Sequence, residues 1–148
     1  MIIYLDTSAL VKRYLQEDDS DKIISLFNSG GHLFGSIVVT QVEMAAALQR
    51  ALRMKATTSR LATEVWQDFL DDWQSLTRLR VFTSTIERAS ENAFKYDLRG
   101  YDSLHLAGAL LWQETLGVQI VLATFDRELW MAGQKAGLLS WPPGFILD

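Results

Sequence analysis

The stretch Ile2-Ile3-Tyr4-Leu5-Asp6-Thr7-Ser8 decides the fold of this chain. Its first four residues form an apolar run of β-forming types, which favours a buried strand. Thr7 and Ser8 carry hydroxyls that cap helices, and a helical pattern of apolar residues follows them. The stretch therefore predicts a strand that passes directly into a helix, with the carboxylate of Asp6 at the junction.

The same alternation of strand and helix continues along the chain. Further strands are predicted at 33–39, 79–82 and 118–123, and further helices at 20–28, 40–54, 58–76, 85–98, 101–116 and 126–137. Continuously apolar strands that alternate with helices indicate a parallel sheet covered on both faces. We therefore predict an α/β fold, a three-layer sandwich with a central parallel sheet, and a single domain over residues 1–148.

Composition narrows the class of protein. The chain has no cysteine and only two separate histidines, His32 and His105, which excludes a disulfide framework and a conventional zinc site. No apolar run approaches the ~20 residues of a membrane span, and no basic leader segment is present. The net charge of −4 argues against a generally basic surface for nucleic acid. We expect a protein of the reducing cytoplasm without a membrane partner.

Four acidic residues lie where predicted strands end or predicted helices begin: Asp6, Glu43, Asp102 and Asp126. The functional crevice of an open parallel sheet lies at the carboxyl ends of its strands. Any one of these acids alone is explained by the favourable dipole at a helix N-terminus. Four carboxylates at one rim, however, repel one another and call for a cation. An all-oxygen set favours Mg²⁺ or Mn²⁺, and such ions support phosphodiester hydrolysis.

These residues also carry a family resemblance. The stretches in question are Leu5-Asp6-Thr7-Ser8-Ala9-Leu10, Val42-Glu43, Tyr101-Asp102-Ser103-Leu104-His105-Leu106-Ala107 and Ala123-Thr124-Phe125-Asp126. In order and spacing they resemble PIN-domain signatures, above all those of VapC-type toxins from toxin–antitoxin pairs. The resemblance implies an endoribonuclease that depends on Mg²⁺ or Mn²⁺, with the four acids as metal ligands. It also implies an RNA substrate and a small antitoxin protein as partners.

Three polar neighbours of the acids each have two interpretations. Ser8 either orients Asp6 or simply caps a helix, and Thr124 beside Asp126 has the same two interpretations. His105 lies three residues after Asp102, so it is either a base or a packed, hydrogen-bonded core histidine.

Partner surfaces and the C-terminal segment leave further alternatives open. Two bulky apolar stripes are candidates for the antitoxin surface, for the core, or for the seam of a homodimer: Leu10, Val11 and Tyr14, and Trp66, Phe69 and Trp73.

Near the C-terminus, the segment 141–144 (Trp-Pro-Pro-Gly) departs from the family's usual final strand. It leaves open whether Leu138 and Leu139 begin such a strand.

Other functions compete with a toxin nuclease. A phosphatase of the haloacid-dehalogenase type also begins with a strand and an Asp, but it needs a second Asp where this chain has Ser8. A PIN-fold RNA-processing nuclease without an antitoxin, and a non-catalytic PIN-fold binding module, remain as alternatives. The capacity of the acids to bind a metal ion separates the binding module from the nucleases.

Overall fold

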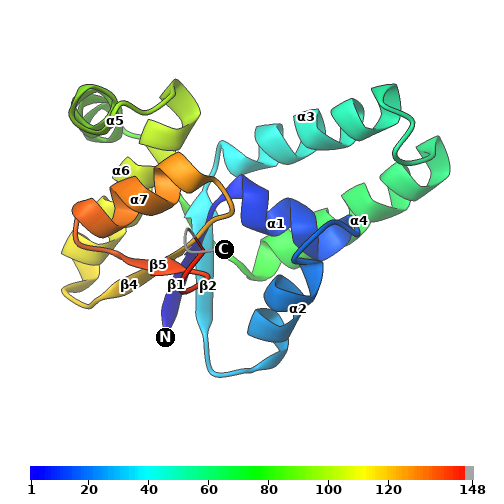
Figure 1. The fold of residues 1–148 in the computed structure, drawn as a ribbon, viewed down its shortest axis with the longest axis horizontal. Helices are drawn as coiled ribbons and strands as arrows, with labels where there is room; N and C mark the ends of the chain where they lie inside the picture. The colour runs from blue at the N-terminus through cyan, green and yellow to red at the C-terminus, as the bar shows by residue number, and fades with distance from the viewer. Residues whose placement is uncertain (146–148) are drawn as a thin grey trace.

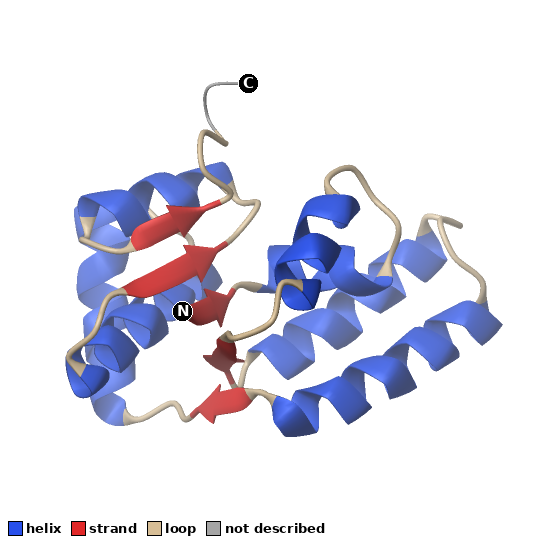
Figure 2. Ribbon diagram, turned by 90° about the horizontal axis from the view of Figure 1, so that it is seen from below, coloured by secondary structure: helices blue, strands red, loops and turns tan. Residues whose placement is uncertain are grey.

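The computed structural model of this chain describes residues 1–145. Its elements are β1 (Ile2–Leu5), α1 (Thr7–Tyr14), α2 (Ser20–Asn28), β2 (Leu33–Ile37), α3 (Thr40–Arg53), α4 (Ser59–Ser75), β3 (Thr77–Leu79), α5 (Thr83–Tyr96), α6 (Gly100–Leu116), β4 (Ile120–Ala123), α7 (Arg127–Lys135) and β5 (Leu139–Trp141). Figure 2 shows the strands gathered in one sheet with helices around them, which confirms the α/β class.

The five strands form one parallel sheet in the order β3-β2-β1-β4-β5. The strand quoted first, β1, is therefore central. Its residues pair with β2 on one side and with β4 on the other, where Leu5 is in register with Ala123. Figure 1 shows α5, α6 and α7 on one side of the sheet and α1, α2 and α4 on the other, so the predicted three-layer arrangement is confirmed.

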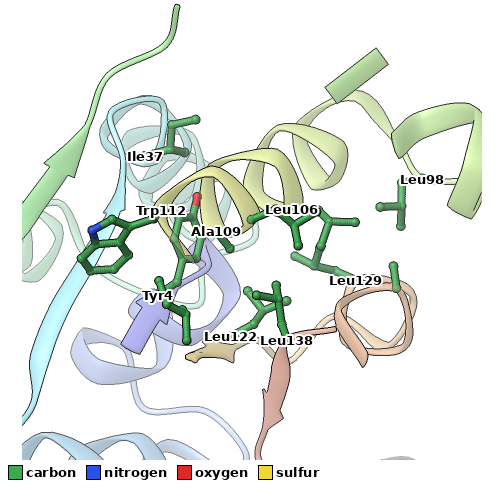
Figure 3. Packing of buried hydrophobic residues seen from close by; sticks show 12 residues of the cluster. Tyr4, Ile37, Leu98, Leu106, Ala109, Trp112, Leu122, Leu129 and Leu138 are labelled. Atoms are coloured by element: carbon green, nitrogen blue, oxygen red, sulfur yellow. The ribbon is translucent and has the colours of Figure 1, made fainter. Parts of the chain in front are cut away.

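The core consists of two clusters because alternate residues of a strand point to opposite faces. Tyr4 points into the cluster beneath α6 and α7, which Figure 3 shows with Leu106, Leu122 and Leu129. Ile3 belongs to the opposite cluster, beneath α1, α2 and α4. Because β1 is the central strand and is buried on both faces of the sheet, its residues are continuously apolar.

The aromatic stripe of α4 belongs to this second cluster. Phe69 is fully buried and Trp73 is 3% exposed, and both pack in the same cluster as the buried Leu10 of α1. Trp66 and Tyr14 are partly buried against it. The prediction of a partner surface is therefore wrong for Phe69, Trp73 and Leu10, because α1 and α4 cover one another, and the core alternative holds for these side chains.

Strand β3 lies two to three residues earlier than predicted. The sequence predicts 79–82, whereas β3 pairs Thr77 to Leu79 with Gly35 to Ile37 of β2. An edge strand extends only as far as its partner, and β2 itself ends at Ile37 instead of Val39. Residues 80–82 consequently leave the sheet and lead into α5.

The final strand forms, and Pro142 marks its end. Strand β5 runs parallel to β4, with Ala123 in register with Trp141. The backbone N–H of Thr124 donates to the Trp141 carbonyl at 3.1 Å. Pro142 has no N–H to offer a further ladder bond. The open question about this segment is thus answered by a short edge strand over residues 139–141.

Helix α6 is apolar on nearly all faces because it packs between the sheet and α5. Leu106, Ala107 and Ala109 are all completely buried. Its first turn carries Asp102, so the buried helix fixes one of the predicted site residues. None of the helices within residues 1–145 combines the length and the apolar character that a bilayer span requires.

Candidate carboxylate site

Asp6 and Asp126 are neighbours because the strands that precede them are paired. Asp6 follows β1 and is the N-cap of α1, and Asp126 follows β4 and is the N-cap of α7. The backbone N–H of Asp6 donates to the Ala123 carbonyl at 2.9 Å, which continues the β1–β4 ladder one residue further. Both carboxylates thus lie at the carboxyl edge of the sheet, as the sequence predicts.

Glu43 and Asp102 reach the same rim from the first turns of α3 and α6. The structure divides the four acids into two pairs. In the inner pair, Asp6 and Glu43 lie on either side of the imidazole of His105, at 3.4 Å and 2.7 Å from its Nε2. In the outer pair, Asp102 and Asp126 share a single guanidinium group.

Hydroxyl groups hold the carboxylate of Asp6 from two directions. Its Oδ2 accepts from the Ser8 hydroxyl at 2.5 Å, from the Ser8 backbone N–H at 3.2 Å and from the Thr124 hydroxyl at 2.9 Å. The Thr124 hydroxyl in turn accepts from the backbone N–H of Asp126 at 3.0 Å. Ser8 and Thr124 therefore orient Asp6, and Thr124 links the inner pair to the outer one.

Glu43 is held by two buried residues, Thr7 and His105. Its Oε2 accepts from the Thr7 hydroxyl at 2.7 Å and is 2.7 Å from Nε2 of His105. Burial by itself raises the pKa of Glu43, but the bonds from His105 and Thr7 outweigh it and lower the pKa. Glu43 is thereby kept ionised although it is more than half covered.

His105 is a completely buried histidine with a partner at each ring nitrogen. Nδ1 lies 3.0 Å from the hydroxyl of Tyr4, and Nε2 faces Glu43. Burial lowers the pKa of His105, and the nearby charges of Asp6 and Glu43 overcome this and raise it. Burial and the charge of Asp6 raise the pKa of Tyr4, which stays a neutral phenol. These contacts agree with the packed core interpretation and make His105 a positioning residue for Glu43.

Arg99 binds both members of the outer pair. Its Nε donates to Asp102 Oδ2 at 2.7 Å, and its Nη2 donates to Asp126 Oδ2 at 2.7 Å. The hydrogen bond that Arg99 donates to Asp102 and the charges of both carboxylates raise the pKa of Arg99. Burial raises the pKa of Asp102, and repulsion from Asp126 and Asp6 adds to this, while Arg99 opposes both. The outer pair is thus neutralised in part by one cation of the chain itself.

Three residues of the site were not among those the sequence analysis assigned to it: Thr7, Tyr4 and Arg99. Thr7 was predicted only as a helix cap and Tyr4 only as part of a strand. A signal existed for Arg99, because an Arg three residues before Asp102 lies within reach of it on a helix.

The chemistry of the donor set fits a hard divalent cation. Four carboxylates from four separate elements meet at one rim with hydroxyls behind them, and such oxygen ligands suit Mg²⁺ or Mn²⁺. In the present side-chain arrangement, however, no three Asp, Glu or His side chains among residues 1–145 are placed so that they could hold an ion together. Two of the four carboxylates have turned one oxygen each to Arg99.

A groove of about 640 Å³ begins beside the inner pair, at Thr7 and Ser8, and runs between α1 and α3. Its lining is mainly apolar and includes Val11, Met54 and Phe125. Two cations, Lys12 and Arg50, also line it. The site therefore opens into a groove that offers apolar surface to an approaching chain.

Comparison with known proteins places these observations in a family. A family model for the PIN domain matches residues 3–132. The curated protein Ribonuclease VapC45 of Mycobacterium tuberculosis is 31% identical over 137 residues, which is 92% of this chain and 92% of that protein.

Two solved structures share the fold. The structure of VapC20 from Mycobacterium tuberculosis, described as a toxin that cleaves the sarcin-ricin loop, matches with a TM-score of 0.67 at 17% identity, over 93% of this chain and 96% of that one. The structure of VapBC2 from Rickettsia felis, bound to a DNA fragment from its promoter, matches with a TM-score of 0.62 at 14% identity, over 95% of this chain and 97% of that one. At these identities the likeness concerns the fold.

Proposed function

This chain belongs to the PIN-domain family, and on that premise we propose that it is an endoribonuclease dependent on Mg²⁺ or Mn²⁺. One observation carries the proposal: the carboxylates of Asp6, Glu43, Asp102 and Asp126 come from four elements and meet at the carboxyl edge of β1 and β4. The name Ribonuclease VapC of a relative that is 31% identical supports RNA as the substrate.

In this proposal the four carboxylates hold the ion, which when bound supplies Lewis-acid activation of the attacking water and offsets charge at the phosphate. The residues of the chain place the ligands. Ser8 and Thr124 fix Asp6, and Thr7 and His105 fix Glu43, so the inner pair is oriented before an ion arrives. Oriented ligands reduce the reorganisation that ion binding would otherwise cost.

The test is RNA cleavage by the purified chain, measured on an end-labelled RNA with chelator and with added Mg²⁺ or Mn²⁺. We expect cleavage only with the ion, and loss of cleavage in Asp126→Asn, whose circular dichroism spectrum should match the parent. Glu114→Gln, a carboxylate of α6 paired with Arg88, is the control and should cleave normally. Cleavage by Asp126→Asn at the parent rate would refute the proposed site. Failure of the parent to bind Mn²⁺ at all would favour a non-catalytic binding module.

We further propose that a small antitoxin protein covers the site and that the chain is a toxin component. The relatives named VapC support this role, and so does the groove that begins at Thr7 and Ser8. Val11 and Phe125 line that groove and are only partly buried, which suits an apolar segment of a partner. The proposed partner surface is therefore the groove with Val11 and Phe125, because Phe69 and Trp73 are buried in the core.

Co-expression with a short reading frame next to the gene tests this second proposal. We expect the two proteins to purify together with suppressed RNase activity, and Val11→Asp to weaken the complex while cleavage by the free chain persists. If the chain is expressed alone, active and harmless to its host, it is an RNA-processing nuclease without an antitoxin.

A further inference from the structure

The side chain of Arg99 is mostly in solvent, yet two of its guanidinium nitrogens each contact a carboxylate. The side chain is 71% exposed, while Nε and Nη2 each contact a carboxylate oxygen at 2.7 Å. The two acceptors, Asp102 and Asp126, lie on different elements, α6 and the N-cap of α7. A planar guanidinium bridges two such oxygens well, since its donors form a fixed fork.

No structural task at this end of α6 requires the Arg99 side chain. Arg99 is the N-cap of α6 by backbone conformation, but its side chain makes no capping hydrogen bond. The backbone bond that starts the helix runs from Ser103 N–H to the Arg99 carbonyl and is independent of the side chain. Exposed ion pairs of long side chains hold weakly because ordering the chain costs entropy. The bridge can therefore open without disturbing the helix.

We propose that Arg99 is the cation that a divalent ion displaces from Asp102 and Asp126, so that ion binding and release of Arg99 are one exchange. This inference rests on the proposed metal dependence. The two cations would compete for the same two carboxylates, of which Arg99 now contacts one oxygen each. They also repel each other strongly at the few ångströms that separate groups sharing those ligands.

The exchange concerns the outer pair and leaves the inner pair in place. The hydroxyls of Ser8, Thr124 and Thr7 donate to Asp6 and Glu43 and are neutral, so they do not repel an incoming ion. The remaining partner of this pair, His105, is completely buried and cannot swing into solvent as Arg99 can. The inner carboxylates are therefore already oriented, whereas the outer ones become available only when the guanidinium leaves. Arg99 acts in this scheme as a competitor for the ligands and not as a catalytic residue.

The test is calorimetric titration of the full chain with Mn²⁺ alone, without RNA. We expect Arg99→Gln to bind Mn²⁺ about three- to thirtyfold more tightly than the parent, the range for losing two partly exposed ion pairs. Arg99→Lys keeps the charge but has one compact donor group in place of the fork, and it should fall between the two.

Arg127→Gln is the matched control because Arg127 is an exposed cation directly after Asp126. It removes the same charge close to the site, so it measures the general electrostatic effect. We expect a change within about twofold, as for an exposed charge that is screened by solvent. A second readout is the Arg99 Nε–H signal in ¹⁵N nuclear magnetic resonance, which should lose its protection from exchange when Mg²⁺ is added.

The outcomes separate this inference from the proposed function. Tighter binding in Arg99→Gln than in Arg127→Gln, with release of the Arg99 signal by Mg²⁺, supports the exchange. If the parent binds Mn²⁺ and Arg99→Gln binds equally or more weakly, the exchange is overturned while metal dependence stands. If no variant binds Mn²⁺, both are overturned.

Discussion

The inner and outer pairs of carboxylates differ in the groups that stabilise their negative charges. Asp6 and Glu43 are bound by the hydroxyls of residues that directly follow β1 and by a completely buried histidine of α6. Asp102 and Asp126 are bound by one solvent-exposed arginine. Donors held in the interior orient a ligand permanently, whereas a flexible, exposed cation stabilises a carboxylate only until another cation replaces it. The inner pair is thus held in a fixed orientation, whereas the charge of the outer pair is neutralised by an exchangeable cation.

The largest effect that bears on this comparison is on catalysis, and it should be the same for both pairs. We expect Glu43→Gln and Asp102→Asn each to lower RNA cleavage at limiting Mg²⁺ by about a hundredfold or more, because each removes an anionic ligand. Single-turnover cleavage of one labelled RNA measures both. Parent-like cleavage by either variant would show that its pair is dispensable and that the site consists of the other pair alone.

Removal of His105 should have the second largest effect, on folding. His105→Ala leaves the buried Tyr4 hydroxyl without its 3.0 Å partner and deprives Glu43 of its bond to the imidazole. We expect a loss of about 2–4 kcal/mol in the free energy of unfolding. His32→Ala is the control, because the hydrogen bonds of its ring go to exposed groups and its one ring contact is with the partly buried Phe34, so it should change stability little. Urea denaturation of both variants decides; equal stabilities would contradict the rigid inner pair.

Neutralising one acid in each pair should distinguish the pairs by stability. In chelator, Asp6→Asn weakens the three hydrogen bonds that converge on one carboxylate oxygen, because an amide oxygen is a weaker acceptor. We expect the free energy of unfolding to fall by about 1 kcal/mol. Asp102→Asn relieves repulsion while it loses an exposed ion pair, so we expect a change within about 0.5 kcal/mol. Thermal unfolding followed by circular dichroism compares them. A larger loss for Asp102→Asn would reverse the assignment of rigid and exchangeable halves.

Arg99→Gln should have the smallest effect on stability. The side chain is mostly exposed and caps nothing, so we expect the free energy of unfolding without metal to stay within about 0.5 kcal/mol of the parent. The same urea titration measures it. A larger loss in the free energy of unfolding would show that the Arg99 bridge stabilises the packing of α6 on α7. Exchange of Arg99 for an ion would then destabilise the fold.

The parts of this site that the sequence predicted follow from local rules. Asp6 and Asp126 directly follow apolar runs that are paired parallel strands, so their place at the sheet edge needs only the fold class. Asp102 and Glu43 lie in first helical turns, where periodicity suffices. The four acids were found because each is marked by the element next to it.

The parts that the sequence missed depend on contacts between distant segments. Tyr4 meets His105 across the interior, and Thr7 meets Glu43 between α1 and α3. No local pattern marks such a pair. The boundary of β3 was missed for a related reason, since Ile37 of the neighbouring strand decides where Leu79 ends the pairing. The choice between core and surface for Phe69, which the sequence left open, likewise depends on which helices cover this side chain.

The pairing of β1 with β4 has a consequence for the nascent chain. Ile2 lies far before its partner Ile120 of β4 in the chain, so Ile120 emerges from the ribosome much later than Ile2. Until then β1 lacks its neighbour, and Asp6 lacks both the Ala123 carbonyl and the Thr124 hydroxyl. Contacts of such high sequence separation form late in folding. A polypeptide that has not yet reached β4 therefore cannot assemble the complete carboxylate rim, so the nuclease activity proposed for this rim can begin only after β4 and Asp126 have been synthesised.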